Sequence, residues 1–274
     1  MVVQRVAFQG EPGAYSEMAA FHYFPTAALL PAKSFQNVFE SLESGKVDFA
    51  VVPIENSIEG SVNETYDLLL VTNMTVCGEI YQKIRHCLIV NPGADDSKIR
   101  SVYSHPQALA QCRAYLQKKN LEPIATYDTA GAVKMIQQTG LMEAAAIASK
   151  RAADLYGMRI CEESIEDKKN NYTRFLVLSK AQSKPTGNDG TSIIFSVRHI
   201  PGALFSILEE FARRRINLTK IESRPTKEAP WEYNFYVDFN GHATDENIAH
   251  TLQLVKNKSA FFKILGSYKK AEFD

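Results

Sequence analysis

Four short polar clusters follow apolar segments of the sequence, and their side chains could hold a small anionic ligand. The first is the loop Gly10–Ser16, whose glycines let a ligand approach the backbone. Free N–H groups at the start of a helix would favour an anion there. Taken alone, this loop is better explained as a turn with Ser16 as a helix N-cap. It has neither the G-x-G-x-x-G pattern nor the P-loop lysine, so it does not indicate a nucleotide site.

The second cluster, Pro53–Gly60, directly follows a short and nearly continuous apolar run. In open α/β sheets, ligands bind outside the carboxyl ends of the strands. Glu55 and Asn56 would emerge at such an end, where they could hold a hydroxyl and a carboxylate. A glutamate in a loop usually has no special role, but a polar pair directly after a core strand favours a site.

The third cluster is Ser104–Gln107, with Gln111 one helical turn further on. Proline suits the first position of a helix, so Ser104 would lie at the helix mouth beside unpaired N–H donors. Gln107 and Gln111 are four residues apart and share a helix face. These groups would form a neutral cradle for a carboxylate. His105 could act as an acid or base, since the intrinsic pKa of histidine is about 6.5, but a lone histidine is more often structural.

The fourth cluster is Asn171–Phe175, which leads into another apolar segment. Thr173 offers a hydroxyl group and Arg174 a permanent cation. A strand start with a surface arginine is the usual meaning of such a pentapeptide. Asp128 also precedes an expected helix, and a helix cap is the better explanation of that residue on its own.

Several classes of function are disfavoured by the composition. The 31 basic and 31 acidic residues give a net charge of +0, which does not suit a nucleic-acid partner. The six histidines show no paired ligand spacing and the four cysteines no C-x-x-C pair, so we expect neither a metal nor redox chemistry. No apolar run approaches the length of about 20 residues that a membrane helix needs, and no secretory signal is present. We therefore expect a cytoplasmic protein with reduced cysteines.

Apolar runs and helical patterns alternate before residue 181, which is typical of an α/β fold with mostly parallel sheets. The expected strands are Val2–Phe8, Val47–Val52, His86–Val90, Ser101–Tyr103 and Ala145–Ala148. The expected helices are Ser16–Phe24, Phe35–Leu42, Ser61–Leu70 after a capping box, Pro106–Lys118 and Ala130–Gln138.

Residues 181–190 are rich in Pro, Gly and small polar residues, so they are expected to form a linker. Beyond them the pattern changes to βαββαβ, which is the ferredoxin-like order. The expected elements are Thr191–His199, Pro201–Arg215, Asn217–Ser223, Tyr233–Phe239, Thr244–Lys256 with Thr244 as its cap, and Phe261–Tyr268.

Taken together, the motifs resemble those of prephenate dehydratases, in their order and approximate spacing. The matching segments are GEPGAYS, PIENSIEGSVNETYDLL, SHPQALAQC and NNYTRF, and residues 201–205 and 216–225 resemble an ACT domain. The resemblance implies a two-lobed catalytic domain like a type II periplasmic binding protein in residues 1–180. One lobe would hold about 1–80 with 165–180 and the other 81–164. Residues 191–274 would form the ACT domain.

The resemblance also implies the reaction, in which prephenate loses carbon dioxide and water to give phenylpyruvate. No cofactor is needed, because the aromatic product supplies the driving force. Thr173 would donate to the departing oxygen, with Glu55 and Asn56 near the hydroxyl. The substrate would be bound by Ser104, Gln107, Gln111, Arg174, Phe175, Asp128 and Ser16, with Arg174 offsetting charge and Phe175 packing.

For the ACT domain, the resemblance implies feedback by L-phenylalanine, bound between two chains of a homodimer or of a dimer of dimers. Its predicted ligand residues are Gly202, Ala203, Leu204, Asn217, Leu218, Glu222, Ser223 and Arg224. Two alternatives stay open. Arogenate dehydratases share these motifs, and a non-catalytic sensor of a small acid and an amino acid would have the same two binding parts.

Overall fold

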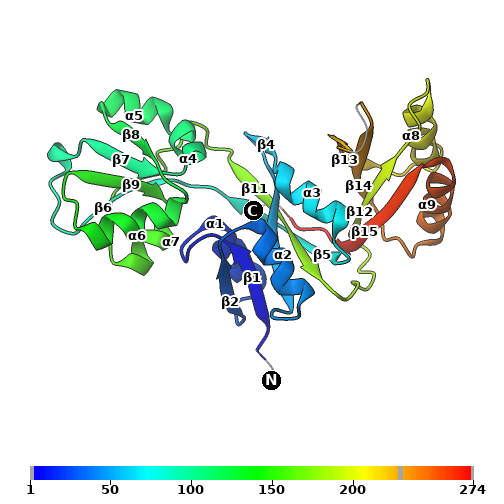
Figure 1. The fold of residues 1–274 in the computed structure, drawn as a ribbon, viewed down its shortest axis with the longest axis horizontal. Coiled ribbons are helices and arrows are strands. Elements are labelled where there is room, and N and C mark those ends of the chain that lie inside the picture. The colour runs from blue at the N-terminus through cyan, green and yellow to red at the C-terminus, as the bar shows by residue number, and fades with distance from the viewer. Residues whose placement is uncertain (1–2, 228–230, 273–274) are drawn as a thin grey trace. The chain divides into compact units, whose positions relative to one another are not determined.

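The computed structural model describes residues 3–227 and 231–272, and its first sheet carries the polar segments around Asn56 and Thr173 (Figure 1). The strand order is β2-β1-β3-β11-β5, and β1 is parallel to both β2 and β3. These elements are β1 (Arg5–Gln9), β2 (Ala28–Ala32), β3 (Phe49–Asn56), β4 (Gly60–Ser61) paired with β3, β5 (Thr75–Lys83), β11 (Tyr172–Ser179), α1 (Tyr15–Tyr23), α2 (Phe35–Glu43) and α3 (Asn63–Val71).

The second sheet has the order β10-β6-β9-β7-β8. Its pairings are parallel for β7 with β8 and β9, but antiparallel for β6 with β9 and β10, so the mostly parallel arrangement expected from the sequence holds only in part here. The elements are β6 (Cys87–Val90), η1 (Asp96–Lys98), β7 (Ser101–Ser104), α4 (Pro106–Gln111), α5 (Arg113–Lys119), β8 (Glu122–Ala125), α6 (Thr129–Thr139), β9 (Ala144–Ala148), α7 (Lys150–Tyr156) and β10 (Arg159–Glu163).

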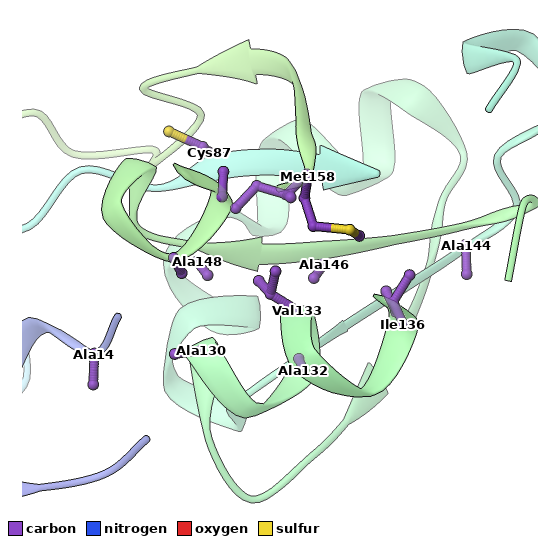
Figure 2. Packing of buried hydrophobic residues seen from close by; sticks show 13 residues of the cluster. Ala14, Cys87, Ala130, Ala132, Val133, Ile136, Ala144, Ala146, Ala148 and Met158 are labelled. Atoms are coloured by element: carbon purple, nitrogen blue, oxygen red, sulfur yellow. The ribbon is translucent and has the colours of Figure 1, made fainter. Parts of the chain in front are cut away.

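Strand β9 explains why this second sheet has a core on each face. Its sequence AAAIA is fully buried, and alternation along the strand sends Ala144, Ala146 and Ala148 to one face and Ala145 and Ile147 to the other. Figure 2 shows Ala144, Ala146 and Ala148 facing α6. Because alanine is small, helix α6 packs closely on strand β9.

The third sheet is antiparallel, with the order β13-β14-β12-β15, and confirms the ferredoxin-like prediction. Its elements are β12 (Asp189–Ser196), α8 (Ala203–Arg213), β13 (Leu218–Pro225), β14 (Tyr233–Asn240), α9 (Glu246–Lys258) and β15 (Phe261–Lys269). The apolar faces of both helices pack on the sheet, through residues such as Ile207, Phe211 and Leu252. The amphipathic helix that the sequence predicts here is thus confirmed.

Four predicted helix ends are wrong. Ala14, not Ser16, is the N-cap of α1, since Ala14 has extended backbone and the helix begins at Tyr15, with no side-chain cap. Asp245 caps α9, while Thr244 pairs with a histidine side chain. The predicted helix Pro106–Lys118 divides at Cys112, whose non-helical backbone ends α4 and begins α5. The residue Ser61 belongs to β4, and α3 begins at Asn63.

Contacts divide the chain into two compact units, residues 1–66 with 80–175 and residues 67–79 with 176–274. The strand β12 begins at Asp189, so the last residues of the segment expected as a linker lie in a strand. The Asp189 carboxylate accepts hydrogen bonds from Thr186 and Gly187, which orders this end of the segment. Within the described ranges, no helix is long and apolar enough to cross a membrane.

Candidate active site

Asn56 is the hub of a buried polar network in the first unit. It is the last residue of β3, and its Oδ1 accepts hydrogen bonds from the backbone N–H groups of Ile58 and Glu59, both at 3.0 Å. Its Nδ2 donates to Asn171 Oδ1 at 2.7 Å and to Thr173 Oγ1 at 3.0 Å. The loop after β3 therefore folds back to hold the amide that contacts Thr173.

The network continues to helix α4 through Asn171, the residue before β11. This residue is fully buried, and its Nδ2 donates to Oε1 of Gln111 at 2.9 Å. Gln111 is the last residue of α4, and its side chain is nearly buried. Residues more than 50 positions apart in the sequence thus share one hydrogen-bonded chain.

His86 and Tyr15 extend the network on its other side. The Nε2 atom of His86 lies 2.9 Å from Gln111 Oε1, and its Nδ1 lies 3.0 Å from the hydroxyl of Tyr15, which also donates to the Arg85 carbonyl at 2.6 Å. Burial lowers the pKa of His86 below its ordinary value of 6.5, and hydrogen bonding to Gln111 opposes that shift. Burial raises the pKa of Tyr15 well above 10.0. Both groups are therefore neutral at physiological pH.

These residues line a pocket of about 140 Å³. Its walls are Tyr15, Ser16, Pro53, Asn56, Ile84, His86, His105, Gln107, Ala108, Gln111, Thr129, Thr173 and Phe175. None of these described lining residues carries a permanent charge, so an anion here would be bound by neutral donors. His105 is the N-cap of α4, since its Nδ1 accepts a hydrogen bond from the backbone N–H of Gln107 at 3.3 Å.

The pocket gathers part of the predicted site. Asn56, Thr173, Gln107, Gln111, Phe175 and Ser16 line it, whereas Glu55, Ser104, Asp128 and Arg174 do not. Glu55 lies on β3 next to Asn56 and is half-buried, and Arg174 lies next to Thr173 on β11. Their functional roles stay predictions.

Ser104 and Asp128 have structural partners. The Ser104 side chain is fully buried and donates to the Ile147 carbonyl at 2.6 Å, so its hydrogen is committed to the neighbouring strand β9. Asp128 is the N-cap of α6 and accepts from the Gly131 backbone N–H at 2.8 Å, which is the structural explanation that the sequence favoured. Burial raises the pKa of Asp128, and hydrogen bonds from Gly131 and Ala130 oppose the shift.

The glycine-containing loop after β1 makes contacts with α6 and α7 in the same unit. Ser149 Oγ donates to the Gly13 carbonyl at 2.6 Å, and Tyr156 donates to the Pro12 carbonyl at 3.1 Å. A side chain at Gly13 would place its Cβ only 2.8 Å from the Cα of Ala152, in a backbone with φ of +94°. Glycine is therefore needed here for a close approach between two parts of the protein.

Three residues of the network were missed as site residues, namely Tyr15, His86 and Asn171. Tyr15 and Asn171 stand within polar clusters that the sequence singled out, but no role was assigned to them. His86 was taken as the start of a strand. A buried histidine between two amides has no local sequence signal, because its partner Gln111 is 25 residues away.

In the second unit, Ala203 and Leu204 line another pocket of about 140 Å³, with Val197, Arg198, His199, Ile200, Trp231, Glu232, Tyr233 and Phe235. Gly202 precedes it as the N-cap of α8, with a left-handed φ of +78°. The remaining predicted phenylalanine-binding residues, Asn217, Leu218, Glu222, Ser223 and Arg224, lie on or beside β13 and do not line this pocket. Arg224 instead contacts Asp67 at 3.2 Å.

The architecture and the pocket define a two-lobed α/β protein with a ferredoxin-like domain. A profile of the prephenate dehydratase family matches residues 6–183, and one of the ACT domain matches residues 191–253. The chain therefore belongs to the prephenate dehydratase family. No group of three or more His, Cys, Asp or Glu side chains in residues 3–227 and 231–272 is arranged to hold a metal ion.

Three similar proteins illustrate this relationship. The chain is 45% identical to arogenate dehydratase/prephenate dehydratase 2, chloroplastic, of Arabidopsis thaliana, over 96% of this chain and 72% of the relative. A prephenate dehydratase from Arthrobacter aurescens, solved with L-Phe, has a TM-score of 0.89 and 32% identity, covering 97% and 90% of the two chains. The structure of GqqA, described as a novel type of quorum quenching acylase, has a TM-score of 0.90 and 33% identity, covering 98% of each chain.

Proposed function

We propose that the chain converts prephenate to phenylpyruvate by decarboxylating dehydration, under feedback control by L-phenylalanine. The family and the named relatives support this reaction and its regulation. The pocket adds the chemical argument, since it combines four hydroxyl groups, three side-chain amides and apolar walls in a space suited to a small molecule.

The reaction breaks two bonds of the substrate and requires no covalent step on the protein. The bond between the ring and its carboxylate breaks, its electron pair enters the ring to complete the aromatic system, and the C–O bond at the opposite ring carbon breaks. The departing oxygen takes up one proton, which comes from solvent in the overall balance, and leaves as water beside carbon dioxide. The site must hold a dianion in place and stabilise charge on the departing oxygen, which is catalysis by positioning and by fixed donors.

The observation that carries the proposal is the direction of the hydrogen bond at Thr173. An amide nitrogen has no lone pair to accept with, so Thr173 Oγ1 must be the acceptor of the bond from Asn56 Nδ2. The threonine hydrogen is then available to the pocket that Thr173 lines. Because a threonine hydroxyl is a very weak acid, we assign it the role of a hydrogen-bond donor to the departing oxygen.

The other predicted residues complete the proposal. The Gln111 amide and the neighbouring Gln107 would bind a carboxylate, and Phe175 would pack against the ring. Glu55 would act near the hydroxyl end, and Arg174 would offset the charge of the substrate. We also propose that Gly202, Ala203 and Leu204, with the residues of β13, bind L-phenylalanine.

Replacing Thr173 tests the assignment. We expect Thr173→Ala to lower kcat with prephenate by about 10²–10³-fold, the usual effect of removing one donor to a developing oxyanion. Thr173→Ser, which keeps the hydroxyl, should retain much more of the rate. Circular dichroism and the melting temperature serve as fold controls. Full activity of Thr173→Ala would contradict the mechanism.

Arogenate is the second candidate substrate, because the Arabidopsis relative carries both names. The two substrates differ in the side chain, which is a keto acid in prephenate and an amino acid in arogenate. A comparison of kcat/KM for both, with and without L-phenylalanine, decides between them. Stabilisation by ligand without any turnover would instead favour a sensor.

Acyl transfer is a third candidate, favoured by the similarity to GqqA. A threonine nucleophile needs a base within hydrogen-bonding distance of its hydroxyl. Among the described residues, the hydrogen-bond partner of Thr173 Oγ1 is the Asn56 amide nitrogen, which is a donor and cannot take a proton. Release of a free acid from an acylated amine, lost in Thr173→Ala, would nevertheless identify this activity.

We further propose that the catalytic domain spans residues 1–180 and the regulatory domain 191–274, joined by 181–190. The protein would work in the cytoplasm as a homodimer or a dimer of dimers. The four cysteines are free, which suits a reducing compartment. Light scattering with and without L-phenylalanine measures the assembly.

A further inference from the structure

We propose that Asn171 and His86 are positioning residues, which hold the hydrogen-bonded chain from Asn56 to Gln111 in one direction so that Thr173 and Gln111 both present donors to the ligand. The proposal rests on the proposed function, because it explains how a pocket lined by uncharged groups would receive a dianion. It predicts one specific form of His86, with its proton on Nε2.

The direction is set at Asn56. Two backbone N–H groups, of Ile58 and Glu59, point at one end of its side-chain amide. A backbone N–H can only donate, so that end must be the oxygen and the other end the nitrogen. The nitrogen then donates one hydrogen to Asn171, and its other hydrogen is shared between Thr173 Oγ1 at 3.0 Å and the Tyr172 carbonyl at 3.2 Å. None of these bonds can be reversed without breaking the two backbone bonds.

Asn171 passes this direction on to the second sheet. Because its oxygen accepts from Asn56, its nitrogen faces Gln111 and donates to Gln111 Oε1. The Gln111 oxygen is therefore turned away from the pocket and toward Asn171 and His86. The Gln111 amide nitrogen, at the other end of the group, is left with its two hydrogens for a ligand.

His86 provides the second hydrogen-bond donor to Gln111 Oε1. Its Nε2 lies 2.9 Å from the Gln111 oxygen, which can only accept, so Nε2 must carry a hydrogen. In the neutral ring, Nδ1 then holds the lone pair, 3.0 Å from the Tyr15 hydroxyl, whose single hydrogen is shared between Nδ1 and the Arg85 carbonyl at 2.6 Å. Gln111 is thus held by two donors, one from Asn171 and one from His86, and cannot rotate its amide without losing both.

The first experiment reads the His86 proton directly. Two-bond ¹H–¹⁵N correlation spectra of the full chain at pH 8, without substrate, distinguish the two neutral forms of a histidine ring. The signals of His86 are assigned by their loss in His86→Gln. We expect the Nε2–H form, and the Nδ1–H form would overturn the proposal. Since no turnover is involved, this result is independent of whether prephenate is the substrate.

The second experiment reverses the hydrogen bonds at Gln111 with a nearly isosteric substitution of Asn171. In Asn171→Asp, one carboxylate oxygen still accepts from Asn56, while the other replaces the nitrogen that faced Gln111. Two oxygens would then lie in contact, so the Gln111 amide should rotate and donate to both neighbours. His86 must then accept at Nε2 and move its proton to Nδ1, where it donates to Tyr15.

The matched control for the added charge is Gln107→Glu, which changes a lining residue outside the chain of hydrogen bonds. His86 should change form in Asn171→Asp and keep its Nε2 proton in Gln107→Glu. We also expect Asn171→Asp to raise KM for the anionic substrate by about 10–100-fold, since a donor to a charged group becomes an acceptor. A ring that keeps its Nε2 proton in folded Asn171→Asp would overturn the proposal. If that variant does not fold, the form of His86 in the unmodified protein still decides the question.

Discussion

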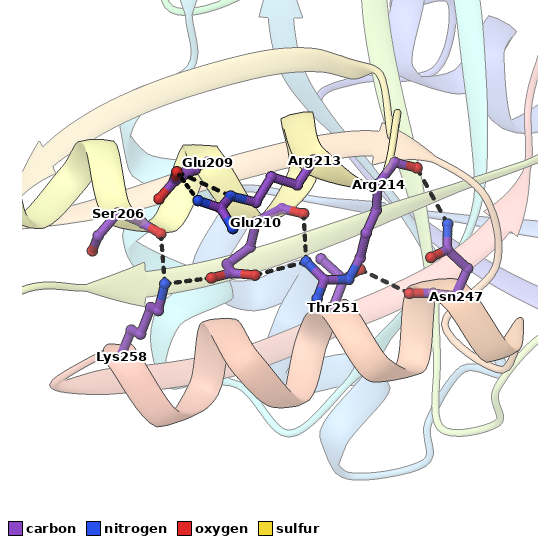
Figure 3. A network of polar contacts seen from close by, with 8 residues as sticks. All are labelled: Ser206, Glu209, Glu210, Arg213, Arg214, Asn247, Thr251 and Lys258. Carbon is purple, nitrogen blue, oxygen red and sulfur yellow. Dashed lines mark hydrogen bonds and ion pairs between the residues drawn. The ribbon is translucent and has the colours of Figure 1, made fainter.

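The pocket and the ACT domain use polar networks of opposite kinds. In the pocket, neutral groups are buried, and the hydrogen bonds of Asn56 and Asn171 have a defined direction. In the ACT domain, Glu210 of α8 instead binds Arg214 at the C-cap of the same helix, at 2.6 Å, and also contacts the ammonium group of Lys258 on α9 (Figure 3). An ammonium group can rotate its three hydrogens toward any acceptor, so this contact has strength but no direction.

We expect the pocket network to affect catalysis and the Glu210 ion pairs to affect only stability. The direction of the amides decides which atoms face a ligand, so reversing one bond should change catalysis while the fold persists. Lys258 joins Glu210 to α9, whereas Arg214 pairs with Glu210 within α8, and the Glu210 side chain is only 11% exposed. None of the three residues lines the pocket, so their loss should reduce stability and leave the chemistry intact, and salt should screen the partly exposed Lys258 charge.

The largest effect on catalysis should come from reversing the hydrogen bond between Asn56 and Thr173. In Asn56→Asp, the backbone N–H groups keep their acceptor, but a carboxylate oxygen replaces the nitrogen that faced Thr173. The threonine should then donate its hydrogen to that carboxylate instead of to the substrate. We expect kcat with prephenate to fall by about 10²–10³-fold, with a rise in KM.

Asn171→Asp serves as the matched variant for this prediction, because it adds the same charge to the same network but leaves Thr173 paired with Asn56. It should act mainly on KM and retain most of kcat. Equal losses of kcat in the two variants would show that the charge, and not the direction of the bond to Thr173, is what matters.

The fold was predictable where strands are buried on both faces. The strands β3 and β9 are near-continuous apolar runs, and both were expected. The strands β2, β5, β8 and β10 were missed, and each lies at an edge of one of the first two sheets. An edge strand has one free side and less buried surface, so residues such as Pro31 in β2 and Pro123 in β8 are tolerated and obscure the pattern.

The site was predictable only in part, because its contacts are distant in the sequence. Asn56 and Gln111 were found through their positions at the end of a strand and on the face of a helix. Asn171 and His86 were not, since their partners lie 115 and 25 residues away. Ser104 was placed at the helix mouth, but alternation along β7 turns its side chain into the core, and His105 takes the capping position.

A smaller effect is expected from breaking the ion pairs of the ACT domain. Glu210→Gln should lower the melting temperature by a few degrees at low salt and leave kcat within about twofold, because the charges only link α8 to α9. The difference from the unmodified protein should shrink in about 1 M NaCl, where the Debye length is about 3 Å.

Glu209→Gln is the matched control for Glu210→Gln. Glu209 pairs with Arg213 within α8 alone, at 2.7 Å, so its loss should cost less stability than the loss of the pair that spans two helices. A loss of stability in Glu210→Gln that persists in high salt would show that Glu210 acts through directional hydrogen bonds, like the pocket residues. The contrast between the two networks would then be weaker.

The smallest effects should appear as two separate pH dependences of stability. Burial lowers the pKa of His86 below 6.5, so the unfolded chain gains a proton first as the pH falls, and stability declines below about pH 6.5 until the folded pKa is passed. Hydrogen bonds and charge from Lys258 and Arg214 hold the pKa of Glu210 below 4.5, so its contribution is present above that pH and is lost only in stronger acid.

Urea unfolding between pH 7.5 and 5.5 separates the two groups. The free energy of unfolding of the unmodified protein, minus that of His86→Gln, should decrease over this range as the pH falls. The same difference taken with Glu210→Gln should stay constant, because the glutamate is ionised in both the folded and the unfolded chain there. A constant difference for His86→Gln would mean that the imidazole is not held neutral by burial. A decline for Glu210→Gln would mean that its ion pairs depend on another group that titrates in this pH range.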